Sequence, residues 1–219
     1  MNLLPIKARA SEGPSHTCEL FFIDRTLFSP EYFFLNVLPL IPGVEKEESG
    51  PLSGASSARA YAEVASQIKK YTTYIEKFTA LYKDAKVNVA IDFQVATFLH
   101  ITDKVSFRLP IKTEPDIYAK DIFRTYSVPE GELLNIFIFY VRESILSALK
   151  AAVRAPALEI EDNFQQTEPT VQVANIHTLN QRLLSYETMG RVTVLSDAPE
   201  RKRRKKKAPT QEPFEKRAS

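Results

Sequence analysis

Residues 132–154 read ELLNIFIFYVRESILSALKAAVR, and their spacing predicts one long helix. The polar side chains Glu143, Ser147, Lys150 and Arg154 fall on one narrow stripe of that helix. Most other positions are apolar, so the helix must pack on more than one surface. We expect a sheet on one side and a second subunit on the other, with these side chains at the oligomer interface: Ile138, Val141, Ile145 and Leu149.

Two strands are predicted upstream of this helix. Residues 86–96, KVNVAIDFQVA, alternate apolar with polar side chains, which puts one face on a core and the other toward water. The alternation resumes at residues 104–111. Thr102 and Asp103 suit a turn between the two segments, so an antiparallel hairpin is expected.

The remaining elements are predicted from shorter signals. Residues 18–28, CELFFIDRTLF, and 116–126, DIYAKDIFRTY, are expected to be strands. Residues 53–85 are expected to form a helical insertion, because apolar side chains recur there at three- and four-residue steps. A shorter C-terminal helix is expected at residues 176–189. This order of elements favours the α+β class.

The chain divides into three parts on composition. Residues 1–17 are expected to be a flexible leader, residues 18–190 one α+β domain, and residues 191–219 a disordered basic tail. The formal net charge is +2, but residues 201–219 hold nine basic and two acidic residues, a local charge of +7. The first 200 residues therefore carry about −5. The body is acidic and the tail is basic.

The tail contains seven consecutive basic side chains that could bind a polyanion: Arg201, Lys202, Arg203, Arg204, Lys205, Lys206 and Lys207. The partner could be nucleic acid, an anionic membrane surface or an acidic protein, and such binding is non-specific and salt-dependent. A solubilising end without a partner is the alternative interpretation.

Several functional classes are disfavoured by what the sequence lacks. There is no apolar run long enough to span a bilayer, and Cys18 as the single cysteine permits no intramolecular disulfide. This suggests a reducing, cytoplasmic setting. Phosphate-binding glycine motifs, a zinc spacing and a nucleophile motif are absent as well. We therefore expect a non-enzymatic protein without cofactor or metal.

An aromatic cluster near the N-terminus has two interpretations. The side chains could line an apolar groove for extended polypeptide clients beside an open edge strand, or they could be core. The candidate groove residues are Phe21, Phe22, Phe28, Tyr32, Phe33 and Phe34.

At the long helix, the segment LLNIFIFYVRESILSAL resembles SecB-type export chaperones. The residues that fit are Asn135, Ile136, Tyr140, Arg142 and Glu143, whereas Phe139 stands where that family usually has proline. Residues 155–164 resemble the loop that follows in the family, and residues 121–123, 105–112 and 21–30 resemble its strands. The resemblance covers residues 18–30 and 86–189.

The resemblance implies a four-stranded antiparallel sheet packed by a long helix and a shorter C-terminal helix. It also implies a homo-oligomer, a dimer or tetramer, that binds unfolded clients without ATP. The helical insertion and the basic tail depart from the family, so its docking to an export motor is in doubt. Arg142 and Glu143 are expected to form solvated or interface ion pairs.

Two functional hypotheses follow. The first is an ATP-independent chaperone that holds unfolded or extended polypeptides in apolar grooves of an oligomer. The second is a nucleic-acid-associated structural protein, viral in one scenario, that acts through the basic tail.

Overall fold

The protein combines helices with two three-stranded sheets, which confirms the α+β class. The computed structural model describes residues 1–9, 18–41, 44, 55–82, 86–95, 98–154, 168–173 and 192–194. The strands are β1 (Leu3–Arg9), β2 (Cys18–Asp24), β3 (Lys86–Val95), β4 (Leu99–Arg108), β5 (Thr170–Val173) and β6 (Val192–Val194). The helices are α1 (Pro30–Tyr32), η1 (Phe33–Val37), η2 (Leu38–Leu40), α2 (Ala55–Leu81), α3 (Glu114–Thr125) and α4 (Glu132–Arg154).

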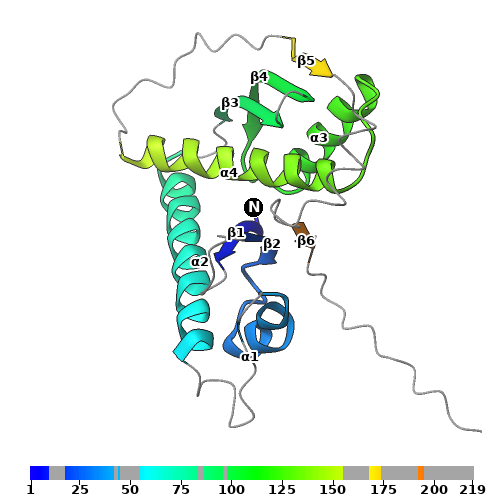
Figure 1. Ribbon diagram of the computed structural model, residues 1–219. Helices are drawn as coiled ribbons and strands as arrows, with labels where there is room; N and C mark the ends of the chain where they lie inside the picture. Colours follow the sequence, from blue (N-terminus) through cyan, green and yellow to red (C-terminus); the bar gives the residue numbers. More distant parts are fainter. Residues whose placement is uncertain are drawn as a thin grey trace, which may run out of the picture.

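Helix α4 occupies the centre of the molecule and has the bounds that the sequence predicts. In Figure 1 it runs across the middle, with β3 and β4 above it, β1 and β2 below it, and α2 descending at its C-terminal end. It contacts β3, α2, α3, β1 and β6. A helix that is apolar around most of its circumference is therefore covered on several sides within one chain.

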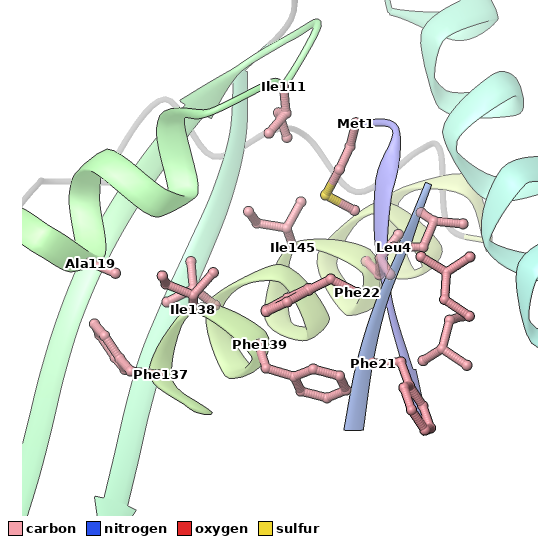
Figure 2. Close-up of a cluster of buried hydrophobic side chains, with 14 of the residues drawn as sticks. Met1, Leu4, Phe21, Phe22, Ile111, Ala119, Phe137, Ile138, Phe139 and Ile145 are labelled. Carbon is pink, nitrogen blue, oxygen red and sulfur yellow. The ribbon is translucent and has the colours of Figure 1, made fainter. Parts of the chain in front are cut away.

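The predicted oligomer interface on α4 is wrong for this reason. Ile138, Val141, Ile145 and Leu149 are all buried, at 7% exposure or less, in the single chain. The second layer against the helix is not a second subunit but the β1–β2 sheet and α2. Figure 2 shows Leu4, Phe21 and Phe22 on that side of α4, and Ala119 and Phe137 on the side of α3.

The hairpin of β3 and β4 confirms the antiparallel pairing and corrects the predicted turn. Buried and exposed residues alternate along β3 as expected. Thr102 and Asp103, however, lie within β4 and pair with Asp92 and Ile91. Asp103 tolerates a buried position, with 9% exposure, because its carboxylate accepts hydrogen bonds from the Tyr118 hydroxyl at 2.7 Å and the Lys104 N–H at 2.6 Å.

The first residues of the chain correct the predicted leader. Residues 3–9 form strand β1, because Leu4, Ile6 and Ala8 alternate toward the core and are at most 2% exposed. β1 pairs antiparallel with β2, which is the strand predicted at residues 18–28, and β6 joins β2 in parallel. Residues 10–17 lie outside the described residues.

The single four-stranded antiparallel sheet is wrong as well. The strand orders are β1-β2-β6 and β3-β4-β5, so the strands divide between two sheets, and one of the pairs is parallel. β6 also corrects the predicted disorder of residues 191–219 at residues 192–194, where Val-Thr-Val has high strand propensity. Residues 195–219 and the predicted helix at 176–189 lie outside the described residues.

Residues 116–126 form a helix rather than the predicted strand. Ala119, Ile122 and Phe123 are spaced three and four residues apart and bury one face of α3. Pro115 and the acidic side chains of Glu114 and Asp116 lie in its first turn, where proline and negative charge favour a helix. The helix expected within residues 53–85 is α2, which packs on α4, β1 and η2.

Candidate binding groove

The predicted client-binding aromatic residues belong mainly to the core. Phe21, Phe33 and Phe34 are at most 9% exposed, which corrects the expectation that these side chains line an open groove. Phe22 is 4% exposed as well, but it does line a groove, which is described below. Phe28 and Tyr32 are half-buried.

The aromatic residues that follow β2 pack around Tyr61 of α2. The Phe28 and Phe34 rings both stack on the Tyr61 ring, with centroid distances of 5.8 and 5.9 Å, and Phe33 meets it edge-on at 5.3 Å. A pair in such a geometry adds about 0.5–1.5 kcal/mol beyond burial. The cluster therefore fastens α2 to the segment that follows β2.

An open groove lies elsewhere, between α3, α4 and the β1–β2 sheet. Its volume is about 390 Å³, within the range of about 300–1,000 Å³ that is usual for ligand sites. The apolar lining comes from Leu3, Phe22, Ile117, Leu134 and Ile138. The polar lining comes from Thr113, Asp116, Lys120, Asn135 and Arg142. We call this site the α3–α4 groove.

Arg142 connects the elements that build the groove. Its side chain is 1% exposed and donates to Asp116 Oδ2 at 2.5 Å, to Asp116 Oδ1 at 3.4 Å and to the Leu3 carbonyl at 3.1 Å. A weaker bond, at 3.5 Å, reaches the Lys112 carbonyl. The Phe22 ring lies 5.8 Å from the guanidinium carbon. One buried cation thus joins α4, α3, β1 and β2.

The expectation of solvated or interface ion pairs is wrong for Arg142 and holds in part for its neighbour. Glu143 pairs with Lys7 of β1 at 2.7 Å, and both side chains are partly exposed. Arg142 points instead into the protein, where a guanidinium is tolerated because Asp116 compensates its charge and carbonyl oxygens accept its other N–H groups.

Most of the polar lining residues are more exposed than Phe22, Leu134 and Ile138 of the apolar lining. The Asp116 side chain is 28% exposed, Asn135 is half-buried, and Lys120 and Thr113 are exposed. Ile117, with 55% exposure, is a large apolar side chain at the groove opening. Burial raises the pKa of nearby Glu114, but hydrogen bonds from its own N–H and from the Lys112 N–H outweigh this effect and lower the pKa overall.

The chemistry of this lining suits binding. None of the ten lining residues is a His, Cys, Ser or Tyr, and the one hydroxyl is that of Thr113. Among the residues that the structure describes, no group of three His, Cys, Asp or Glu side chains could hold a metal ion.

The edge strands bear on the expectation of strand addition by a client. Lys7 of β1 donates its N–H to Gln67 Oε1 at 3.1 Å, and its carbonyl accepts from Gln67 Nε2 at 2.6 Å. On the other sheet, the Tyr140 hydroxyl donates to the Asp92 carbonyl of β3 at 2.7 Å and accepts the Asp92 N–H at 3.3 Å. In β1 and in β3, a single helix side chain thus bonds both the N–H and the carbonyl of one outward-facing residue. Another strand cannot pair with that residue.

The groove could not be recognised from the predicted elements. It needs β1 and α3, which were expected to be a leader and a strand. Two signals pointed to it: the proline and acidic residues that begin α3, and Arg142 on a helix whose neighbouring positions, Val141 and Ile145, are apolar.

Comparison with known proteins adds no relative. No protein-family model matches the chain, and no curated protein matches it. None of the helices that the structure describes is long and apolar enough to cross a membrane. The resemblance to SecB-type chaperones stays a prediction.

Proposed function

We propose that the protein is a non-enzymatic, chaperone-like module that holds unfolded or extended polypeptide segments by their apolar side chains, and that the α3–α4 groove is the holding site. The observation that carries this proposal is an apolar floor that opens to solvent beside the exposed Ile117. Apolar contact without fixed geometry is what a holding protein needs, because its clients differ in sequence.

The groove lies within one chain, so holding a client does not depend on oligomerisation through α4. A homo-oligomer would have to use another surface, and its role would be to bring several grooves to one client. Cooperation between linked sites raises the overall affinity without any new contact. The expected setting is the cytoplasm.

Suppression of client aggregation tests this function. The full chain should reduce the light scattering of a chemically denatured client diluted into buffer, and Ile117→Asp should weaken this effect several-fold because it charges the groove opening. Leu35→Asp is the matched control: Leu35 is 75% exposed on η1, and Figure 1 places that segment, next to α1, far from α3. Equal loss in both variants, or no suppression by the wild type, contradicts the proposal.

Polyanion binding by the basic tail is a second candidate function. It is favoured by the sequence of residues 201–207, seven consecutive basic side chains after a body of net charge about −5. Each phosphate contact contributes to a steep salt dependence, so binding to duplex DNA should weaken by orders of magnitude between low and moderate salt.

Deletion of residues 201–219 separates the two functions. The truncated chain should lose DNA binding in a mobility-shift assay and keep its suppression of client aggregation. Loss of client holding on truncation would instead favour the hypothesis of a nucleic-acid-associated structural protein in which the body is a scaffold.

A further inference from the structure

We infer that the α3–α4 groove recognises the main chain of its partner as well as one apolar side chain, with Asp116 accepting an N–H group of the bound segment. This inference rests on the proposed function and specifies the chemistry of the same site. The partner is a short extended polypeptide segment with an aliphatic or aromatic side chain.

The buried Arg142 side chain holds the Asp116 carboxylate in position. Arg142 donates to both of its oxygens, at 2.5 Å and 3.4 Å, and is itself held by the Leu3 and Lys112 carbonyls. Because Arg142 is 1% exposed, the donor side of these bonds is shielded from water. An acceptor that is held in this way costs little further ordering when a ligand binds.

The carboxylate retains capacity for a ligand. An ionised carboxylate offers about four acceptor positions. Among the described residues, the Asp116 carboxylate accepts two hydrogen bonds, both from Arg142. Its side chain is 28% exposed and lines the groove. A donor that enters the groove can therefore reach it.

The charges of the lining disfavour a cationic donor. Two cations, Arg142 and Lys120, face one anion, Asp116, so the groove has a small positive excess. A cationic ligand gains little from an aspartate whose charge is already compensated, and Lys120 repels it. A main-chain N–H is a neutral donor that every polypeptide carries.

The apolar lining residues of the groove contact the client side chain next to that N–H. Leu3, Phe22, Leu134 and Ile138 surround a space that, at about 390 Å³, is near the small end of ligand sites. A space of this size suits a short segment rather than a folded partner. The Asn135 amide lies on the α4 side of the groove and offers both a donor and an acceptor to the same main chain.

Methylation of peptide nitrogens provides the test. The probe is a short fluorescent peptide with one phenylalanine flanked by glycine and serine, bound to the full-length protein and measured by fluorescence anisotropy. In matched peptides, the nitrogen of the phenylalanine or that of the next residue is methylated, and a third peptide is methylated at a terminal glycine. A hydrogen bond to a charged acceptor predicts about tenfold weaker binding for one of the first two and unchanged binding for the third.

Three results are distinguishable. If the parent peptide binds and neither internal methylation weakens it, main-chain recognition is overturned while the proposed function stands. If the parent peptide does not bind, the result contradicts the proposed function, and with it the inference that rests on it. Asp116→Asn, where it folds, should bind the parent more weakly and respond less to methylation, but the peptide series on the wild-type protein decides the question without that variant.

Discussion

At the scale of single residues, the buried ionisable side chains of Arg142 and Asp103 each bond one side chain of α3. Among the described residues, Asp116 is the carboxylate partner of Arg142, and Asp103 accepts a hydrogen bond from the Tyr118 hydroxyl. Removing one member of a buried ion pair leaves an uncompensated charge and costs about 3–5 kcal/mol. These contacts therefore stabilise the junctions of α3 with α4 and of α3 with β4, and through them the groove.

Tyr118→Phe should lower the free energy of unfolding by about 1–3 kcal/mol at neutral pH, because it leaves Asp103 without the hydroxyl at 2.7 Å. Urea unfolding followed by circular dichroism measures the change. Tyr74→Phe on α2 is the control, since the hydroxyl of Tyr74 makes no hydrogen bond with the described residues, and we expect a much smaller effect.

The same pair predicts a pH dependence. Burial, followed by the hydrogen bond to Asp103, raises the pKa of Tyr118 well above its ordinary value. The folded state then holds this proton more tightly than the unfolded state, whose tyrosine titrates near pH 10. The stability from Tyr118 is full below about pH 10 and is lost as the pH rises further, so wild type should lose more stability than Tyr118→Phe over that range. Parallel losses would contradict this assignment.

At the scale of elements, one edge strand of each sheet is covered at one residue by a helix side chain. Gln67 of α2 and Tyr140 of α4 each occupy the N–H and the carbonyl of one edge residue. On β1, Pro5 lacks an N–H, and the Leu3 carbonyl accepts from Arg142. β1 therefore offers few main-chain groups to another strand, which disfavours strand addition by a client at this edge.

Gln67→Leu should open the edge of β1 while keeping a side chain of similar size. We expect faster hydrogen exchange at the Lys7 amide, measured by NMR, and more self-association at high concentration, measured by sedimentation. Ser66→Leu adds the same apolar side chain at an exposed neighbouring position and serves as the control. Unchanged exchange at Lys7 in Gln67→Leu would show that the glutamine does not protect this edge.

The elements also show what a sequence reveals and what it does not. β3 and α4 were predicted because the apolar residues of each element repeat with one period over ten or more residues. In β3 this period reflects the burial of one strand face, and in α4 the burial of most of the helix surface. β1 was missed because its signal is three alternating residues interrupted by Pro5. α3 was missed because a short apolar segment fits both periods until its capping residues are considered.

The candidate site shows the same limit more strongly. Aromatic residues such as Phe33 and Phe34 are typical of a binding surface when they are judged from sequence alone. In the structure they are buried because α2 packs against them through Tyr61. The groove, in turn, depends on a contact between Leu3 and Arg142, which are 139 positions apart in the sequence. Local patterns do not encode contacts of that range.

At the scale of the whole molecule, the central helix α4 separates the β3–β4 hairpin from the β1–β2 pair (Figure 1). The groove lies between α3, α4 and the β1–β2 sheet. The apolar circumference of α4 is used within the chain. The net charge of +2 combines an acidic body with a tail of +7. We therefore propose client holding by the body and polyanion binding by the tail as two functions that can be tested separately.

The most direct test of the central claim is methyl NMR of the full chain titrated with an apolar peptide. Isoleucine and leucine methyl groups report on the groove through Ile117, Leu134 and Ile138, and on other exposed apolar surface through Leu35 and Leu40. The proposal predicts saturable shifts concentrated at the three groove residues. Shifts at Leu35 and Leu40 with the groove unchanged would contradict it.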